Sequence, residues 1–124
     1  MIALPSLLMA VLVTSTEAPP AAASALLDAI ASGDVPAARA TLADDVVIMD
    51  ETTGDAAASS LEAFARYVHG CEQDDPTWDV DTVDPQRAAV SVSWRCPSRT
   101  AAQAFIWSVG PRIVHIQFGW VPVR

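Results

Sequence analysis

Lysine is absent from this chain of 124 residues, and all seven basic side chains are arginine. Without lysine the protein has neither a Schiff-base nucleophile nor a lysine base. Acidic residues outnumber arginines and give a formal net charge of −8. Such a surface repels phosphate backbones, so nucleic acid is excluded as an expected partner.

The sequence also lacks the motifs of metal, cofactor and nucleophile sites. His69 and His115 are far apart and belong to no ligand pattern, so we interpret them as a helix-end residue and an outer-strand residue. The acidic run Glu72, Asp74 and Asp75 has neither the spacing nor the glycine of a calcium loop. No Gly-x-Ser-x-Gly elbow or phosphate-binding loop occurs. We therefore expect no metal and no cofactor.

Only one long apolar run is present, Ile2–Val13, and it is too short for the roughly 20 residues that span a bilayer. Small residues follow it, which is typical of a secretory signal peptide, although no arginine precedes it. We predict a signal peptide over residues 1–23, cleaved between residues 18 and 23, and a periplasmic or secreted domain over 24–124 without stable membrane insertion. The alternative is a buried N-terminal helix, against which Pro5 and the pair Pro19-Pro20 weigh.

The rest of the chain divides into helices followed by strands. Apolar spacing and capping residues predict helices over Ala21–Ala31, over Ala38–Leu42 with Asp34 as its cap, and from the capping box Ser59-Ser60-Leu61-Glu62 to His69. A short strand, Val46–Met49, separates the second and third helices. Alternation from Thr77 onward predicts four more strands, the last two over Ala101–Val109 and Ile113–Val121. This order predicts one α+β domain in which three N-terminal helices pack in a curved, mostly antiparallel sheet.

The region from about Ala25 to Phe118 resembles the nuclear transport factor 2-like, or SnoaL-like, superfamily. The resemblance rests on Gly33-Asp34 after the first helix, on Leu42-Ala43-Asp44-Asp45-Val46-Val47 before the capped helix, and on the closing hairpin from Phe105-Ile106-Trp107 to His115-Ile116. It implies a cone-shaped fold whose sheet curls around the long helix and leaves a pocket at its open end. It also implies that the outer sheet face can pair two copies. The superfamily contains enzymes and noncatalytic binders, so the resemblance does not assign an activity.

Three functional hypotheses remain open at this point. The first is a noncatalytic scaffold that binds a small apolar ligand in a pocket lined by five aromatic residues: Phe64, Tyr67, Trp94, Trp107 and Phe118. The second is a homodimer paired through the outer sheet face, with Ile113, His115, Gln117, Val121, Ala102, Ala104 and Ile106 as the outward-facing residues. The third is a SnoaL-like enzyme that transfers a proton on a small organic substrate.

The enzyme hypothesis has few residues to support it. Tyr67 is a candidate hydrogen-bond donor, with Asp50, Asp79 or Asp81 as its base. We interpret Asp50 as a solvated strand end, and alternation places Asp79 and Asp81 on the face opposite Trp78. The pattern therefore favours a noncatalytic domain over an enzyme.

Cys71 and Cys96 are the only cysteines, and an exported domain favours a disulfide between them. A two-residue turn at Pro85-Gln86 sets Cys96 opposite Asp75, close to Cys71 at the same end of the hairpin. The bond then ties the third helix to the sheet. The alternative is two buried free thiols.

Overall fold

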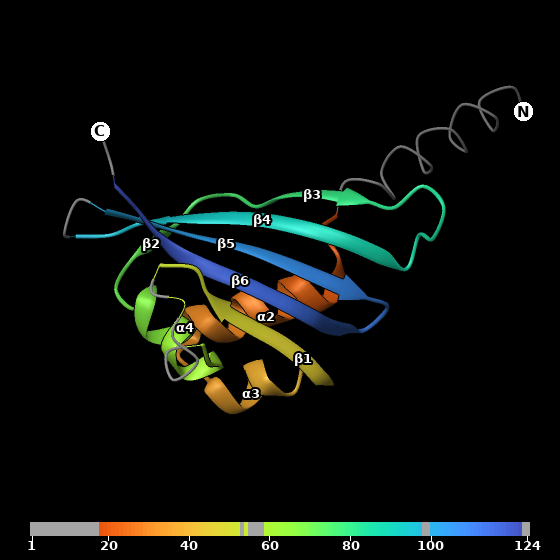
Figure 1. Cartoon of the computed structure of the whole chain (residues 1–124), viewed down its shortest axis with the longest axis horizontal. Helices are drawn as coiled ribbons and strands as arrows, with labels where there is room; N and C mark the ends of the chain where they lie inside the picture. Colours follow the sequence, from red (N-terminus) through yellow and green to blue (C-terminus); the bar gives the residue numbers. More distant parts are fainter. Residues whose placement is uncertain (1–17, 53, 55–58, 98–99, 123–124) are drawn as a thin grey trace, which may run out of the picture.

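The computed structural model describes residues 18–52, 54, 59–97 and 100–122, so most of the predicted signal peptide lies outside the described residues (Figure 1). The described part contains three helices and a sheet of six strands. In chain order they are α2 (Ala21–Ser32), α3 (Val35–Arg39), β1 (Leu42–Asp50), α4 (Leu61–Tyr67), β2 (Glu72–Gln73), β3 (Thr77–Val80), β4 (Arg87–Arg95), β5 (Thr100–Val109) and β6 (Arg112–Pro122).

The helix ends follow from their capping residues. Helix α2 ends at Gly33, whose φ of 73° suits a residue without a side chain. The carboxylate of Asp34 accepts a hydrogen bond from the backbone N–H of Ala37 and starts α3, as predicted. The capping-box assignment is wrong by one residue, because Ser60, not Ser59, caps α4 by accepting from Ala63 N–H.

The sheet has the order β1-β6-β5-β4-β2, with β3 also paired to β4. Strands β3 to β6 form the predicted antiparallel meander, whereas β1 pairs with β6 in parallel. The three helices lie together on one side of the long curved strands (Figure 1). The fold is therefore α+β with a mixed sheet, consistent with the cone shape that the resemblance implies.

The core lies between the helices and the inner face of the sheet. Its largest fully buried apolar side chains come from both layers: Phe64, Leu26, Leu61, Ile106, Ile113, Ile116, Val90 and Val92. These side chains interdigitate across a single layer boundary, so the helices and sheet depend on each other for burial. No helix among the described residues is long and apolar enough to cross a membrane.

Strand β5 presents the opposite face from the one predicted for the outer surface. Ala102, Ala104 and Ile106 are buried under the helices, and Phe105 is exposed on the outer face. The small alanines give the helices room to approach, and the larger aromatic side chains of the strand alternate to the other side. Alternation separated the two sets correctly but could not show which set faces the core.

A bulge in β6 explains a second error. The pairing of β5 with β6 shifts between Trp107 and Ser108, so that Trp107 pairs with His115 while Ser108 pairs with Ile113. The extra residue, Val114, turns Ile113 into the core although it precedes an outward His115 by two positions. Ile113 was predicted to face outward and is instead fully buried.

The structure joins Cys71 to Cys96 in a disulfide, with Cα atoms 4.3 Å apart. The predicted turn at Pro85-Gln86 is present, since the N–H of Arg87 donates to the carbonyl of Asp84. The register inferred from it is wrong, because the N–H of Asp81 bonds to the carbonyl of Arg87 and the loop spans the residues between them. The carboxylate of Asp81 accepts from the N–H groups of Val83 and Asp84, which widens the loop. The disulfide lies beside the strand pair formed by the neighbouring residues Glu72 and Arg95.

Candidate functional site

Asp50 is the buried acid of this fold. It occupies the last position of β1, on the same face as Val46 and Ile48, and its exposed fraction is 0%. Its Oδ2 accepts a hydrogen bond of 2.6 Å from the hydroxyl of Tyr67, and its Oδ1 accepts one of 2.8 Å from the N–H of Thr52. The interpretation of Asp50 as a solvated strand end is therefore wrong.

The turn after Asp50 is fixed against β6. The backbone N–H of Trp120 donates to the hydroxyl of Thr52 at 2.8 Å. The neighbouring Gly119 permits this approach, because a Cβ atom at that position would lie 2.9 Å from the same hydroxyl. Ser59 accepts a bond of 2.9 Å from the N–H of Asp50 and joins the start of α4 to the end of β1. The acid is thus held from both sides of the turn.

Tyr67 reaches Asp50 from the last residue of α4. Its ring packs against Phe118 and Trp120, with centroid distances of 4.9 Å in each case. Burial raises the pKa of the Tyr67 hydroxyl above its usual value, and the hydrogen bond and negative charge of Asp50 raise it further. Tyr67 therefore remains a neutral donor at physiological pH.

The other two acids proposed as partners of Tyr67 lie elsewhere. Asp79 is exposed on β3, in register with Ala89 on the outer face. Asp81 is exposed in the loop after β3, where the two backbone N–H groups that it accepts lower the pKa of its carboxyl. Of the candidate acids, the structure brings only Asp50 to Tyr67.

The five aromatic residues predicted to line an interior pocket divide into two sets. Phe64 packs against Trp94 at 5.7 Å and against Phe118 at 5.3 Å between ring centroids, and Tyr67 completes this cluster. Phe64, Trp94 and Phe118 are buried and fill the space between α4 and the sheet. Trp107 lies on the outer face, where its ring meets that of His115 edge-on at 4.8 Å.

The outer face carries an uncharged surface whose apolar side chains the predicted set of residues missed. Val47 is 47% exposed, Met49 41% and Phe105 39%, and Met49 pairs with Gln117 on β6. We call Val47, Met49, Phe105 and Gln117 the outer patch. The signal was present in the sequence, because Phe105 and Trp107 alternate with the small residues that face the helices.

His115 lies on this outer face, as predicted, but it is not a solvated ring. Its Nε2 is buried and, among the described residues, has no hydrogen-bond partner. The ring packs as an aromatic neighbour of Trp107. Within the described ranges, no group of three or more His, Cys, Asp or Glu side chains is arranged to hold a metal ion.

Comparison with known proteins places this geometry in context. The family model that describes the SnoaL-like domain matches residues 23–116 of this sequence. No curated protein matches the sequence. A crystal structure from Kribbella flavida is similar with a TM-score of 0.56 and 18% identity, covering 80% of this chain and 83% of that one.

Two further solved structures share the fold. The Delta 5-3-ketosteroid isomerase from Mycobacterium sp. has a TM-score of 0.50 and 17% identity over 79% of this chain and 88% of its own. A nuclear transport factor 2-like protein from Burkholderia xenovorans has a TM-score of 0.51 and 13% identity over 80% of this chain and 86% of its own. At such identities the likeness concerns the fold alone. The family match extends over most of the described residues, and the chain belongs to the SnoaL-like domain family.

Proposed function

We propose that this SnoaL-like domain is a noncatalytic scaffold that pairs with a second copy of itself through the outer face of its sheet. The observation that carries the proposal is the outer patch, in which Val47, Met49 and Phe105 are each about two-fifths exposed or more, at 47%, 41% and 39%. Burying such side chains against another protein is favourable, at roughly 25 cal/mol per Å² of apolar surface.

Charge favours a second copy on this surface rather than on the others. Each chain carries a formal net charge of −8, so the repulsion between two copies is weakest when the surfaces that meet carry no charge. The outward positions of β5 at Gln103 and Phe105, and of β6 at Gln117 and Gly119, contain no acid and no arginine. Two-fold symmetry would bring this neutral strip against itself.

The buried acid supports a structural role over catalysis. A general base has to reach the proton that it removes. Asp50 is fully buried, with hydrogen bonds from Tyr67 and Thr52, so we propose that it joins β1 to α4. The isomerase activity of the Mycobacterium sp. structure is therefore not extended to this chain.

We also propose that the protein is exported. The disulfide between Cys71 and Cys96 suits an oxidising compartment, where such bonds form and persist. The proposals of export and of pairing rest on different observations. The disulfide lies at the β2 end of the sheet and includes no residue of the outer patch.

Sedimentation velocity tests the pairing. We expect a dimer for the natural sequence at micromolar concentration and a monomer for Phe105→Glu, which would bring buried like charges together in the interface. Val83→Glu is the matched control, because Val83 is 91% exposed in the loop after β3 and receives the same change. A strict monomer for the natural sequence at high micromolar concentration, or equal dissociation in both variants, would contradict the proposal.

A further inference from the structure

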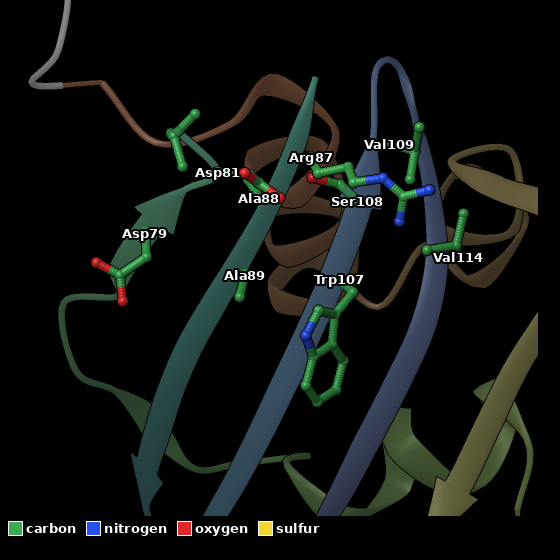
Figure 2. Close-up of a pocket in the computed structure, with 10 residues that line it drawn as sticks. Asp79, Asp81, Arg87, Ala88, Ala89, Trp107, Ser108, Val109 and Val114 are labelled. Carbon is green, nitrogen blue, oxygen red and sulfur yellow. The ribbon is translucent and has the colours of Figure 1, made fainter. Parts of the chain in front are cut away.

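A concavity lies beside the outer patch, at the end of the sheet near the β3–β4 and β5–β6 turns (Figure 2). Its volume is about 350 Å³, at the lower end of the range of roughly 300–1,000 Å³ that is typical of small-molecule sites. We call it the end pocket and define it by the six lining residues that matter here: Asp79, Asp81, Arg87, Ala89, Trp107 and Val109.

The strand register explains why the sheet is hollowed at this point. Asp79 pairs with Ala89, and Ala89 pairs with Trp107, so the three residues form one row across β3, β4 and β5. Figure 2 shows Ala89 between the other two. Because neighbouring strands lie about 4.8 Å apart, the backbone of Asp79 on β3 lies about 10 Å from the backbone of Trp107 on β5. The methyl group of Ala89 leaves the space between them open.

The charges around the end pocket favour a cation. Among the described residues, the carboxylate of Asp79 has no hydrogen-bond or ion-pair partner, and the residue is exposed. Asp81 lines the same pocket and is held by two backbone N–H groups. The one cationic side chain, Arg87, forms an ion pair of 3.3 Å with Asp84 outside the pocket. In Figure 2 the guanidinium of Arg87 extends across Ser108 toward Val109, away from Asp79.

We propose that the end pocket binds a small organic cation of the alkylammonium or quaternary ammonium class. The indole of Trp107 is the aromatic side chain that attracts a cation most strongly. Asp79 supplies an unpaired negative charge on the opposite wall, and Val109 adds apolar contact for the alkyl groups. The proposal uses none of the residues of the outer patch and goes beyond the scaffold function.

Heteronuclear NMR with choline as the probe tests this site. The resonance of the Trp107 indole N–H is identified by its loss in Trp107→Phe. We expect choline to shift it, and an equal concentration of sodium chloride to leave it in place. Neohexyl alcohol, which has carbon in place of the ammonium nitrogen, should bind roughly 2- to 30-fold more weakly, the range expected for loss of a cation–π contact.

Charge variants separate the specific site from general attraction. Asp79→Asn should weaken choline binding by roughly 2- to 5-fold, as loss of an exposed charge pair does. Asp28→Asn, on the exposed side of α2, makes the same change of net charge and should leave binding unaltered. Equal binding of the neutral alcohol, equal effects of the two variants, or no shift with choline would each overturn the proposal.

Discussion

The disulfide between Cys71 and Cys96 makes the most quantitative prediction. Replacing both cysteines with serine removes a covalent tie between the segment after α4 and the end of β4. Beside it, β2 pairs with β4 through the backbone, and Arg95 forms ion pairs with Glu72 and Asp74. These side chains are largely exposed, and exposed ion pairs contribute little to stability. The disulfide therefore adds a covalent constraint to the short backbone pairing of β2 with β4.

Its contribution follows from the length of chain that it closes. The two cysteines are 25 residues apart. On the chain-entropy model, closing a loop of this length lowers the entropy of the unfolded chain and stabilises the fold by about 3.5 kcal/mol. That is a large share of the roughly 5–15 kcal/mol that holds a small domain folded. The double variant should fold at room temperature but with a much smaller margin of stability.

Urea unfolding of the natural sequence and the double variant measures this difference. We expect the variant to lose about 3–4 kcal/mol and to melt roughly 15–25 °C lower. Its m-value should rise, because an unfolded chain without the crosslink exposes more surface. A reductant should destabilise the natural sequence and leave the variant unchanged. A loss below about 1 kcal/mol, or two free thiols in the unreduced natural protein, would refute the reasoning.

Two further predictions concern the buried acid and the N-terminus. Tyr67 is the only tyrosine, so the near-ultraviolet absorbance of tyrosinate reports its pKa directly; we expect a midpoint above the usual value of 10.0, moving down in Asp50→Asn. Because the pKa of Tyr67 is higher in the folded chain than in the unfolded chain, its hydrogen bond to Asp50 stabilises the fold fully below pH 10, and this stabilisation is lost as the pH rises through the folded pKa. A titration midpoint at or below 10.0 would contradict the prediction. Mass spectrometry of protein from its native host should show a chain that starts between residues 19 and 21, within the predicted cleavage range and before the buried Ala22 and Ala23 of α2; a full-length product would contradict export.

The helices could be predicted because their signals are local. Asp34 and Ser60 bond to backbone groups three residues later, and Gly33 adopts the conformation that ends α2. Each of these interactions is complete within one turn of chain, so the sequence around it contains all the information. One error, between Ser59 and Ser60, concerns two adjacent residues that both fit the same pattern. A second concerns the body of the second helix, predicted over Ala38–Leu42, because α3 ends at Arg39 and Leu42 begins β1.

The buried acid could not be predicted, because its environment comes from distant segments. Asp50 follows an apolar run, as a solvated strand end also does. Its burial depends on Tyr67, seventeen residues later, and on the approach of Thr52 to Gly119 across β6. Neither contact leaves a periodic pattern in the sequence. The disulfide was predicted despite a wrong register, because only one pairing of two cysteines is possible.

The misassigned face of β5 bears on the function as well as on the prediction. An antiparallel sheet with helices on one side normally alternates apolar residues inward and polar residues outward. In β5, Ala104 and Ile106 face the helices, while Phe105 and Trp107 face outward, so neither side of the strand is polar. That double apolar character is why alternation could not orient the strand. It is also what a sheet needs when both of its faces are covered: the helices cover the inner face, and a second copy of the chain would cover the outer one.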